Sequence, residues 1–263
     1  MAVAEIGATF SIVVTYALLF SIGAVVMRGA GCAYNDIVDR DFDAKVERTA
    51  NRPIPSGQIS VKGAWTLLIG LCFIGLAILL QFNTYTIFLG LSSLALVALY
   101  PFAKRVTWWP QAWLGLTFNW GALVGYASIA GTLSASALLI YAGSIFWTLG
   151  YDTIYAHQDR DDDALIGVKS SARRLGEKTK PALYLFYGLT LAFFGVAYCV
   201  AGLPLWGLFG LILPAAHFAW QIKRTDINNE NLCLTVFKSN RDAGFMLLAP
   251  LLLAVWSNSL HVS

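Results

Sequence analysis

Two short acidic sequences stand out because their carboxylates recur at a spacing that suits metal binding. Residues 39–44 read Asp-Arg-Asp-Phe-Asp-Ala, and residues 159–164 read Asp-Arg-Asp-Asp-Asp-Ala. Each copy follows an apolar stretch and precedes a basic one. Because the flanking context matches as well as the acidic residues, the sequence indicates an internal duplication.

Within each copy, the acidic side chains lie four residues apart. Asn35, Asp39 and Asp43 show this spacing in the first copy, and Asp159 and Asp163 repeat it in the second. On a continuous helix such residues share one face. Like charges at this spacing destabilise a helix by about 0.2–0.5 kcal/mol per pair, so the pattern favours a bound cation. Carboxylates without His or Cys suit Mg²⁺ or Ca²⁺ rather than Zn²⁺.

Three other interpretations of the acidic copies explain less. A solvated acidic loop does not account for the repeated spacing. An EF-hand loop needs Gly at its sixth place and Glu at its twelfth, whereas Ala44 and Ala50 occupy these places in the first copy, and Ala164 and Ser170 in the second. A transporter would carry ionisable residues inside its spans, where this sequence has almost none.

Basic residues near the acidic copies indicate what the cation would hold. Mg²⁺ usually binds through one or two carboxylates together with substrate phosphates, so the pattern predicts a diphosphate bound through magnesium. The metal would neutralise the negative charge that develops on the diphosphate as it leaves. The candidate cations are Arg48, Arg52, Lys104, Arg105, Lys169, Arg173 and Arg174. A topology signal is a sufficient explanation for Arg173 and Arg174, whereas a very short loop holds Lys104 and Arg105.

The elements that must position these residues are apolar helices. The 263-residue chain is 57% hydrophobic and 13% charged, about half the charged share of a soluble domain. Stretches long enough to span a bilayer lie near 6–31, 61–82, 85–103, 110–130, 134–156, 181–201, 204–222 and 243–260. The sequence predicts an all-α, polytopic membrane bundle of about eight transmembrane helices, built as two pseudo-repeated four-helix halves within one domain, 1–263.

The charges also predict the orientation in the membrane. Lys and Arg gather in the connections near 32–60, 104–109, 157–180 and 223–242, which the positive-inside rule places on the cytoplasmic side. Trp108 and Trp109 are interpreted as interfacial anchors. The 4 Cys form no C-x-x-C pair, so neither a disulfide framework nor a zinc site is predicted.

The longer motifs resemble a known family. Residues 31–57, GCAYNDIVDRDFDAKVERTANRPIPSG, resemble the first signature of the UbiA-type intramembrane prenyltransferases, N-D-x-x-D-x-x-x-D followed by R-T-x-x-R-P. Residues 151–172, YDTIYAHQDRDDDALIGVKSSA, are similar to the second signature in the branch that prenylates 4-hydroxybenzoate. Residues 100–104, YPFAK, resemble the family's Y-x-x-x-K element.

The resemblance implies Mg²⁺-dependent transfer of a polyprenyl group from polyprenyl diphosphate to the ring carbon ortho to the hydroxyl of 4-hydroxybenzoate, in ubiquinone biosynthesis. The implied metal ligands are Asn35, Asp39, Asp43, Asp159 and Asp163. The implied diphosphate-binding residues are Lys104, Arg105, Arg52, Lys169 and Arg48, and Asp36 or Asp159 would handle the ring proton. We expect Tyr100, Tyr155 and Asn119 in the substrate pocket.

Alternative functions are a family member with another aromatic acceptor, and an inactive protein that binds or transports polyprenyl diphosphate. We expect membrane lipids around the chain and no nucleic acid partner, and predict no particular oligomeric state. The location would be the bacterial inner membrane, or the mitochondrial inner membrane in a eukaryote. Family members usually have nine spans, and this chain begins at what resembles their second helix.

Overall fold

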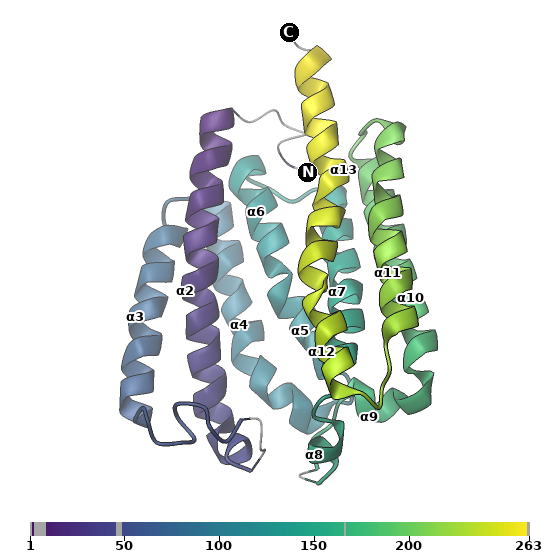
Figure 1. Cartoon of the computed structure of the whole chain (residues 1–263). Helices are drawn as coiled ribbons and strands as arrows, with labels where there is room; N and C mark the ends of the chain where they lie inside the picture. Colours follow the sequence, from purple (N-terminus) through teal and green to yellow (C-terminus); the bar gives the residue numbers. More distant parts are fainter. Residues whose placement is uncertain (1, 3–8, 46–48, 166, 262–263) are drawn as a thin grey trace. The chain divides into compact units, whose positions relative to one another are not determined.

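The computed structural model describes residues 2, 9–45, 49–165 and 167–261, and every regular element in these ranges is a helix (Figure 1). The predicted all-α class is therefore confirmed. The chain divides into two compact units, Thr9–Pro101 and a second that contains Phe102–Ser263. We call them the N-terminal unit and the C-terminal unit.

The N-terminal unit carries the first acidic motif on a long helix. Helix α2 (Phe10–Asp43) packs along α3 (Val61–Leu79), and α4 (Thr84–Val106) follows. Ser60 starts α3 because its side chain accepts a hydrogen bond from the amide of Gly63, which satisfies an otherwise unpaired donor of the first turn. The core between α2 and α3 contains Ala30, Ile37, Ala64 and Leu68.

The C-terminal unit surrounds the helix that leads into the second acidic motif. Its elements are α5 (Pro110–Phe118), α6 (Trp120–Ala130), α7 (Ala135–Tyr155), α8 (Arg160–Leu165), α9 (Ser171–Leu175), η1 (Gly176–Lys178), α10 (Thr179–Val200), η2 (Leu205–Leu211), α11 (Ile212–Arg224), α12 (Glu230–Lys238) and α13 (Asn240–His261). Helix α7 contacts α5, α6, α10 and α12. The buried core includes Ile154, Leu183, Tyr187, Phe218 and Val236.

Helix α7 and α10 approach closely because α7 has a glycine at the contact. A Cβ atom on Gly150 would lie 2.5 Å from Cε1 of Tyr187. The Tyr187 ring stacks on Phe218, with 4.3 Å between ring centroids, and its hydroxyl donates to Oε1 of Gln221 at 2.5 Å. The ring is therefore held from two sides and has little freedom to move away.

We expect Gly150→Ala to destabilise the protein by about 1–3 kcal/mol, the usual cost of forcing an extra carbon into a packed core. The matched control is Gly188→Ala on α10, where a Cβ would meet no atom within 4 Å. There the better helix propensity of Ala should stabilise the chain by up to about 1 kcal/mol. Thermal unfolding in detergent measures both. Equal melting temperatures for the two variants would contradict the packing described here.

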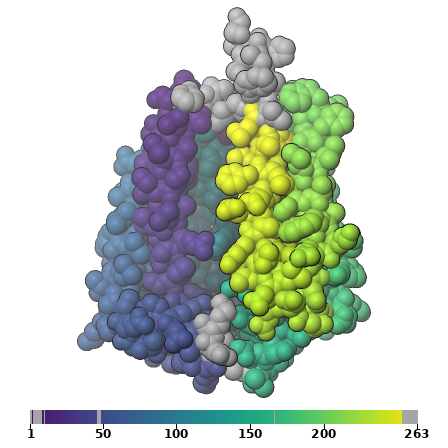
Figure 2. Space-filling view, in the orientation of Figure 1, coloured from purple at the N-terminus to yellow at the C-terminus, as the bar shows by residue number. Residues whose placement is uncertain are grey.

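The surface is suited to lipid. Within the part of the chain that the structure describes, five helical stretches are long and apolar enough to cross a membrane: Ser11–Asp43, Val61–Leu79, Thr84–Val106, Ser171–Val200 and Leu205–Arg224. The three other predicted spans also form helices, as α5 with α6, α7 and α13, but are not among these five. In the C-terminal unit, α11 and α13 contact each other and form one face (Figure 2). Both helices expose large apolar side chains, including Ile212, Leu213, Phe245 and Leu248. The chain is a multi-pass membrane protein.

Candidate active site

The first acidic motif lies at the C-terminal end of α2. Because α2 continues as one helix to Asp43, Asn35, Asp39 and Asp43 share one face, as their spacing predicts. The side chains of Asp39 and Asp43 are buried, with residue exposures of 1% and 6%. The hydroxyl of Thr49 donates to the carbonyl of Asp43 at 2.9 Å, which ties the following loop to the helix end.

Arg52 joins two carboxylates of this motif. Its Nη1 donates to Oδ1 of Asp36 at 2.8 Å and to Oδ2 of Asp43 at 2.9 Å. Asp36 and Asp43 lie two turns apart on α2, so one guanidinium covers both turns. In this structure Arg52, predicted to bind diphosphate, instead places its positive charge beside two carboxylates of the first motif. Arg48, predicted for the same role, lies outside the described residues.

We expect Arg52→Ala to destabilise the chain by about 1–2 kcal/mol. Breaking a buried ion pair costs about 3–5 kcal/mol, and we discount this because the Arg52 side chain is 32% exposed. The matched control is Arg40→Ala, because Arg40 pairs with Asp41 at 3.3 Å on the exposed side of the same helix, where ion pairs contribute about 0–1 kcal/mol. Thermal unfolding in detergent compares the two. A larger loss for Arg40→Ala would contradict the bridging role of Arg52.

The second acidic motif is built differently. Helix α7 ends at Tyr155, a turn follows, and α8 begins at Arg160. The amide of Asp163 donates to the carbonyl of Asp159 at 2.8 Å, so the two residues are one helical turn apart. The two copies therefore have the same spacing of acidic residues but lie on different elements. The first lies on a continuous transmembrane helix, and the second on a separate short helix and the turn before it.

The electrostatics of this second pair favour a cation. The pKa of Asp163 is raised to about 6, because burial and then the neighbouring Asp159 carboxylate raise it by more than Lys104, Arg173 and the Ser170 side chain lower it. A charged carboxylate close to another one is unfavourable unless positive charge compensates it. The pair therefore has the properties expected of ligands for a hard cation.

His157 contributes no positive charge to this motif. Its Nε2 lies 3.0 Å from Oγ1 of Thr179, whose hydroxyl donates to the carbonyl of Gly176 at 2.7 Å. That hydroxyl therefore accepts from His157, so the structure favours the tautomer with the proton on Nε2. Burial, and then the charge of Arg160, lower the pKa of His157 to about 4. The ring is neutral at physiological pH.

The predicted cations of the C-terminal unit lie in two adjoining segments. The amide of Lys169 donates to the carbonyl of Lys104 at 3.1 Å, and the ammonium of Lys169 donates to the carbonyl of Val106 at 3.0 Å. The segment after the second motif is thus joined to the end of α4. Arg105 is exposed, with its guanidinium carbon 5.2 Å from the centroid of the Phe102 ring.

Two of the predicted pocket residues belong to this unit. The Tyr155 ring packs on Phe237, with 4.4 Å between centroids. Asn119 lies at a break between α5 and α6, where its amide nitrogen donates to the carbonyls of Gly115 and Ser144 and to Oγ1 of Thr148 at 2.8–3.1 Å. This amide nitrogen joins α5 to α7. The third predicted residue, Tyr100, belongs to the N-terminal unit.

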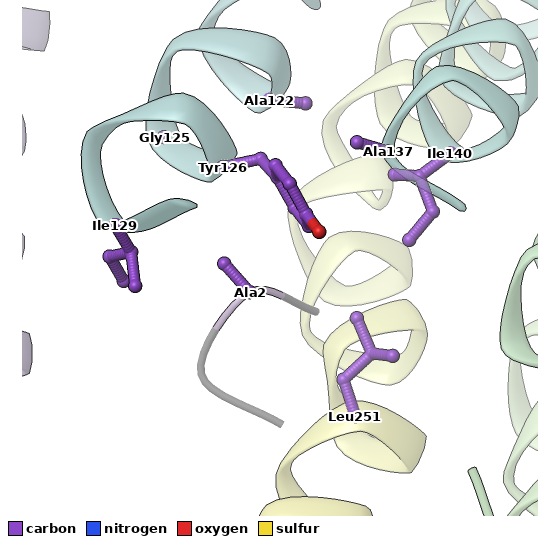
Figure 3. Close-up of a pocket in the computed structure, with 8 residues that line it drawn as sticks. All are labelled: Ala2, Ala122, Gly125, Tyr126, Ile129, Ala137, Ile140 and Leu251. Carbon is purple, nitrogen blue, oxygen red and sulfur yellow. The ribbon is translucent and has the colours of Figure 1, made fainter. Parts of the chain in front are cut away.

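An apolar cavity of about 260 Å³ lies near the start of α7, away from the second acidic motif at the other end of that helix. Tyr126, Ile140 and Leu251 project into it (Figure 3). Ala2, Ala122, Gly125, Ile129 and Ala137 complete its lining. None of the predicted site residues lines this cavity.

The donor set fits a magnesium ion that is completed by substrate. Among residues 2, 9–45, 49–165 and 167–261, no group of three or more His, Cys, Asp or Glu is arranged to hold a metal alone. Mg²⁺ usually takes only one or two carboxylates from the protein and fills its remaining positions with water and substrate phosphates. Each motif offers hard oxygen donors of this kind, the carboxylates of Asp39 and Asp43 in the first and of Asp159 and Asp163 in the second.

Two residues of this region have contacts that sequence reasoning missed. Trp108, interpreted as an interfacial anchor, lies beside Lys169 and Arg173, with their cationic groups 6.0 and 5.4 Å from its ring centroid. Arg173, interpreted as a topology signal, reaches the loop of the second motif. No pattern in the sequence distinguishes Arg173 from the neighbouring Arg174.

Comparisons with known proteins agree with the motifs. Residues 1–254 match the model of the UbiA prenyltransferase family. The chain is 50% identical over 234 residues to a mitochondrial 4-hydroxybenzoate polyprenyltransferase of Caenorhabditis elegans, covering 88% of this chain and 65% of that protein. The chain spans between half and two thirds of the length of such curated relatives.

Solved structures share the fold. The apo structure of a UbiA homolog from Aeropyrum pernix K1 aligns with a TM-score of 0.76 and 27% identity, covering 90% of this chain and 88% of that one. A UbiA homolog from Archaeoglobus fulgidus, bound to GPP and Mg²⁺, aligns with a TM-score of 0.62 and 18% identity, covering 92% and 87%. At that lower identity the likeness concerns the fold alone.

Proposed function

Because this chain belongs to the UbiA prenyltransferase family, we propose that it transfers a polyprenyl group to the ring carbon ortho to the hydroxyl of 4-hydroxybenzoate, in ubiquinone biosynthesis. The observation that carries the proposal is the 50% identity, over 88% of this chain, to a protein named for that activity. The chain retains both acidic motifs and the basic residues that follow them.

Magnesium is the cofactor of this proposal. Asn35, Asp39 and Asp43 would hold it from the first motif, and Asp159 and Asp163 from the second. Bound Mg²⁺ supplies Lewis-acid neutralisation of the diphosphate as it leaves. Two features support this assignment: the oxygen-only donor set, and the presence of Mg²⁺ with a prenyl diphosphate in the fold relative from A. fulgidus.

The basic side chains would bind and orient the diphosphate. Lys104 is the leading candidate in the C-terminal unit, because its charge acts on the Asp163 carboxylate. It lies with Arg105 in the last turn of α4 rather than in the short loop that the sequence predicted. Arg105 and Lys169 would add further positive charge around the diphosphate. Arg52 would hold the side chains of Asp36 and Asp43 in place through its two hydrogen bonds.

The reaction exchanges one bond for another. The bond between the prenyl carbon and the diphosphate oxygen breaks, and diphosphate leaves with the electron pair. A carbon–carbon bond forms from the ring carbon ortho to the hydroxyl, which then loses its proton to a carboxylate, Asp159 or Asp36. Tyr155, Tyr100 and Asn119 would surround the aromatic ring and exclude water from the allylic cation.

The direct test is an assay of the full chain in proteoliposomes. Radiolabelled 4-hydroxybenzoate, farnesyl diphosphate and MgCl₂ should give a prenylated benzoate whose mass exceeds that of the acceptor by one farnesyl group less one hydrogen. Product from another phenol but none from 4-hydroxybenzoate would assign the chain to a different acceptor. Binding of farnesyl diphosphate without product from any phenol would identify a binding or transport protein.

The proposed location is an inner membrane, either bacterial or mitochondrial, with the charged loops on the cytoplasmic or matrix side. The clustering of Lys and Arg in alternate connections supports this orientation, and the relative from C. elegans is named as mitochondrial. Labelling of single cysteines introduced at exposed positions such as Lys45 and Gln81, on opposite sides in this topology, tests it. Labelling of both from the same side would contradict it.

A further inference from the structure

The side chain of Trp108 contacts two cations from the segment after the second acidic motif. The ammonium of Lys169 lies 6.0 Å from the Trp108 ring centroid, and the guanidinium carbon of Arg173 lies 5.4 Å from it. Both distances suit cation–π attraction, for which Trp is the best aromatic partner. A planar guanidinium also stacks on an aromatic face, which an ammonium cannot do. We call Trp108, Lys169 and Arg173 the Trp108 clasp.

Arg173 contacts both ends of the loop that follows Asp163. Its Nη1 donates to the carbonyl of Asp163 at 3.1 Å and to the carbonyl of Val168. The amide of Val168 also donates to the carbonyl of Asp163, at 2.9 Å. Gly167, with a φ of +75°, supplies the left-handed residue that this helix-ending turn requires. The guanidinium therefore fixes the backbone of a predicted metal ligand.

Lys169 fixes the other side of the clasp. Its amide donates to the carbonyl of Lys104, and its ammonium donates to the carbonyl of Val106. Lys104 is followed four residues later by Trp108, so the same short segment provides the ring and the acceptors. The clasp thus joins the backbone of Lys104 to the backbone that carries Asp163.

We propose that Trp108, Lys169 and Arg173 are positioning residues, which hold Lys104 and Asp163 in the arrangement needed to bind a prenyl diphosphate. The inference rests on the proposed function. It adds Trp108 and Arg173, which lie outside both acidic motifs, and it gives Lys169 a positioning role besides its proposed charge near the diphosphate. Its physical basis is that a metal–diphosphate site requires its groups within a fraction of an ångström of the productive arrangement.

Substitutions at two neighbouring arginines separate positioning from a general effect of charge. Arg173→Ala removes the stacking and both hydrogen bonds, whereas Arg173→Lys keeps the charge but loses the planar fork. Arg174→Ala is the matched control, because Arg174 is the next residue in α9 and its side chain is exposed. Trp108→Phe keeps an aromatic face, and Trp108→Leu removes it.

The kinetic readout is the KM for farnesyl diphosphate compared with the KM for 4-hydroxybenzoate, both measured in proteoliposomes. Arg173→Ala should raise KM for farnesyl diphosphate about tenfold, the loss expected for hydrogen bonds made by a charged donor. KM for 4-hydroxybenzoate should change less than about twofold. Arg173→Lys and Trp108→Phe should fall between wild type and Arg173→Ala, and Arg174→Ala should match wild type. Equal effects of Arg173→Ala on both KM values, or equal effects of the two arginine variants, would overturn the inference.

A second readout does not depend on catalysis. Hydrogen exchange of the Val168 and Lys169 amides should quicken about tenfold in Arg173→Ala and stay unchanged in Arg174→Ala. Unchanged exchange in Arg173→Ala would overturn the inference.

A binding measurement separates this inference from the proposed acceptor. If wild type makes no product from 4-hydroxybenzoate, the proposed acceptor is wrong, and Mg²⁺-dependent binding of radiolabelled farnesyl diphosphate is measured in place of KM. Weaker binding by Arg173→Ala alone then supports the clasp, and equal binding by both variants refutes it.

Discussion

Asp39→Asn should reduce prenyl transfer by at least about a hundredfold while the chain still folds and inserts. The side chain of Asp39 is almost fully buried on the helix face shared with Asp43, and the substitution removes one negative charge while keeping the shape. A bound metal that neutralises the leaving group lowers the activation free energy by several kcal/mol, and each 1.4 kcal/mol is about a tenfold change in rate. The same loss is expected for Asp159→Asn in the second motif.

The chain offers matched controls for both substitutions. Asp41→Asn changes a carboxylate that is 83% exposed and paired with Arg40 on the same helix, and Asp161→Asn changes one that is 86% exposed beside Arg160. Both should retain near-wild-type turnover. If Asp39→Asn or Asp159→Asn were as active in membranes as these controls, the metal assignment for that motif would be wrong.

Removal of divalent metal should abolish transfer completely and reversibly. Treatment with EDTA should reduce product to background, and Mg²⁺ should restore it, because the proposed site offers only hard oxygen donors. Zn²⁺, which prefers nitrogen and sulfur ligands, should restore far less. The measurement is product formation against free metal concentration, with chelated enzyme returned to Mg²⁺ as the control for damage. Undiminished activity in EDTA would contradict the account.

The spacing of residues along the sequence was enough to predict that the first motif lies on one face of a helix. Because Asn35, Asp39 and Asp43 recur every four residues directly after an apolar run, the sequence predicted that they share a helix face, and α2 does continue to Asp43. The pairing of Arg52 with Asp36 and Asp43 was not predicted. It depends on how the loop after α2 folds back, which periodicity does not describe.

The break at Asn119 was missed for a different reason. Residues 110–130 are apolar throughout, so hydropathy predicts one span, whereas the structure has two helices separated at Asn119. The Asn119 side chain donates to the carbonyl of Gly115, four residues earlier, and such bonds compete with the helix's own ladder. Similarly, the contact between Trp108 and Arg173 joins residues far apart in sequence, and neither residue type identifies its partner.

The most direct test of the central claim is a structure of the full chain with Mg²⁺ and farnesyl thiodiphosphate, whose leaving group reacts slowly. We expect one diphosphate to be bound through Mg²⁺ to carboxylates of both motifs, Asp39 or Asp43 from α2 and Asp159 or Asp163 from the second. A diphosphate whose metal ions contact only one motif, or one bound without any carboxylate-held metal, would contradict it.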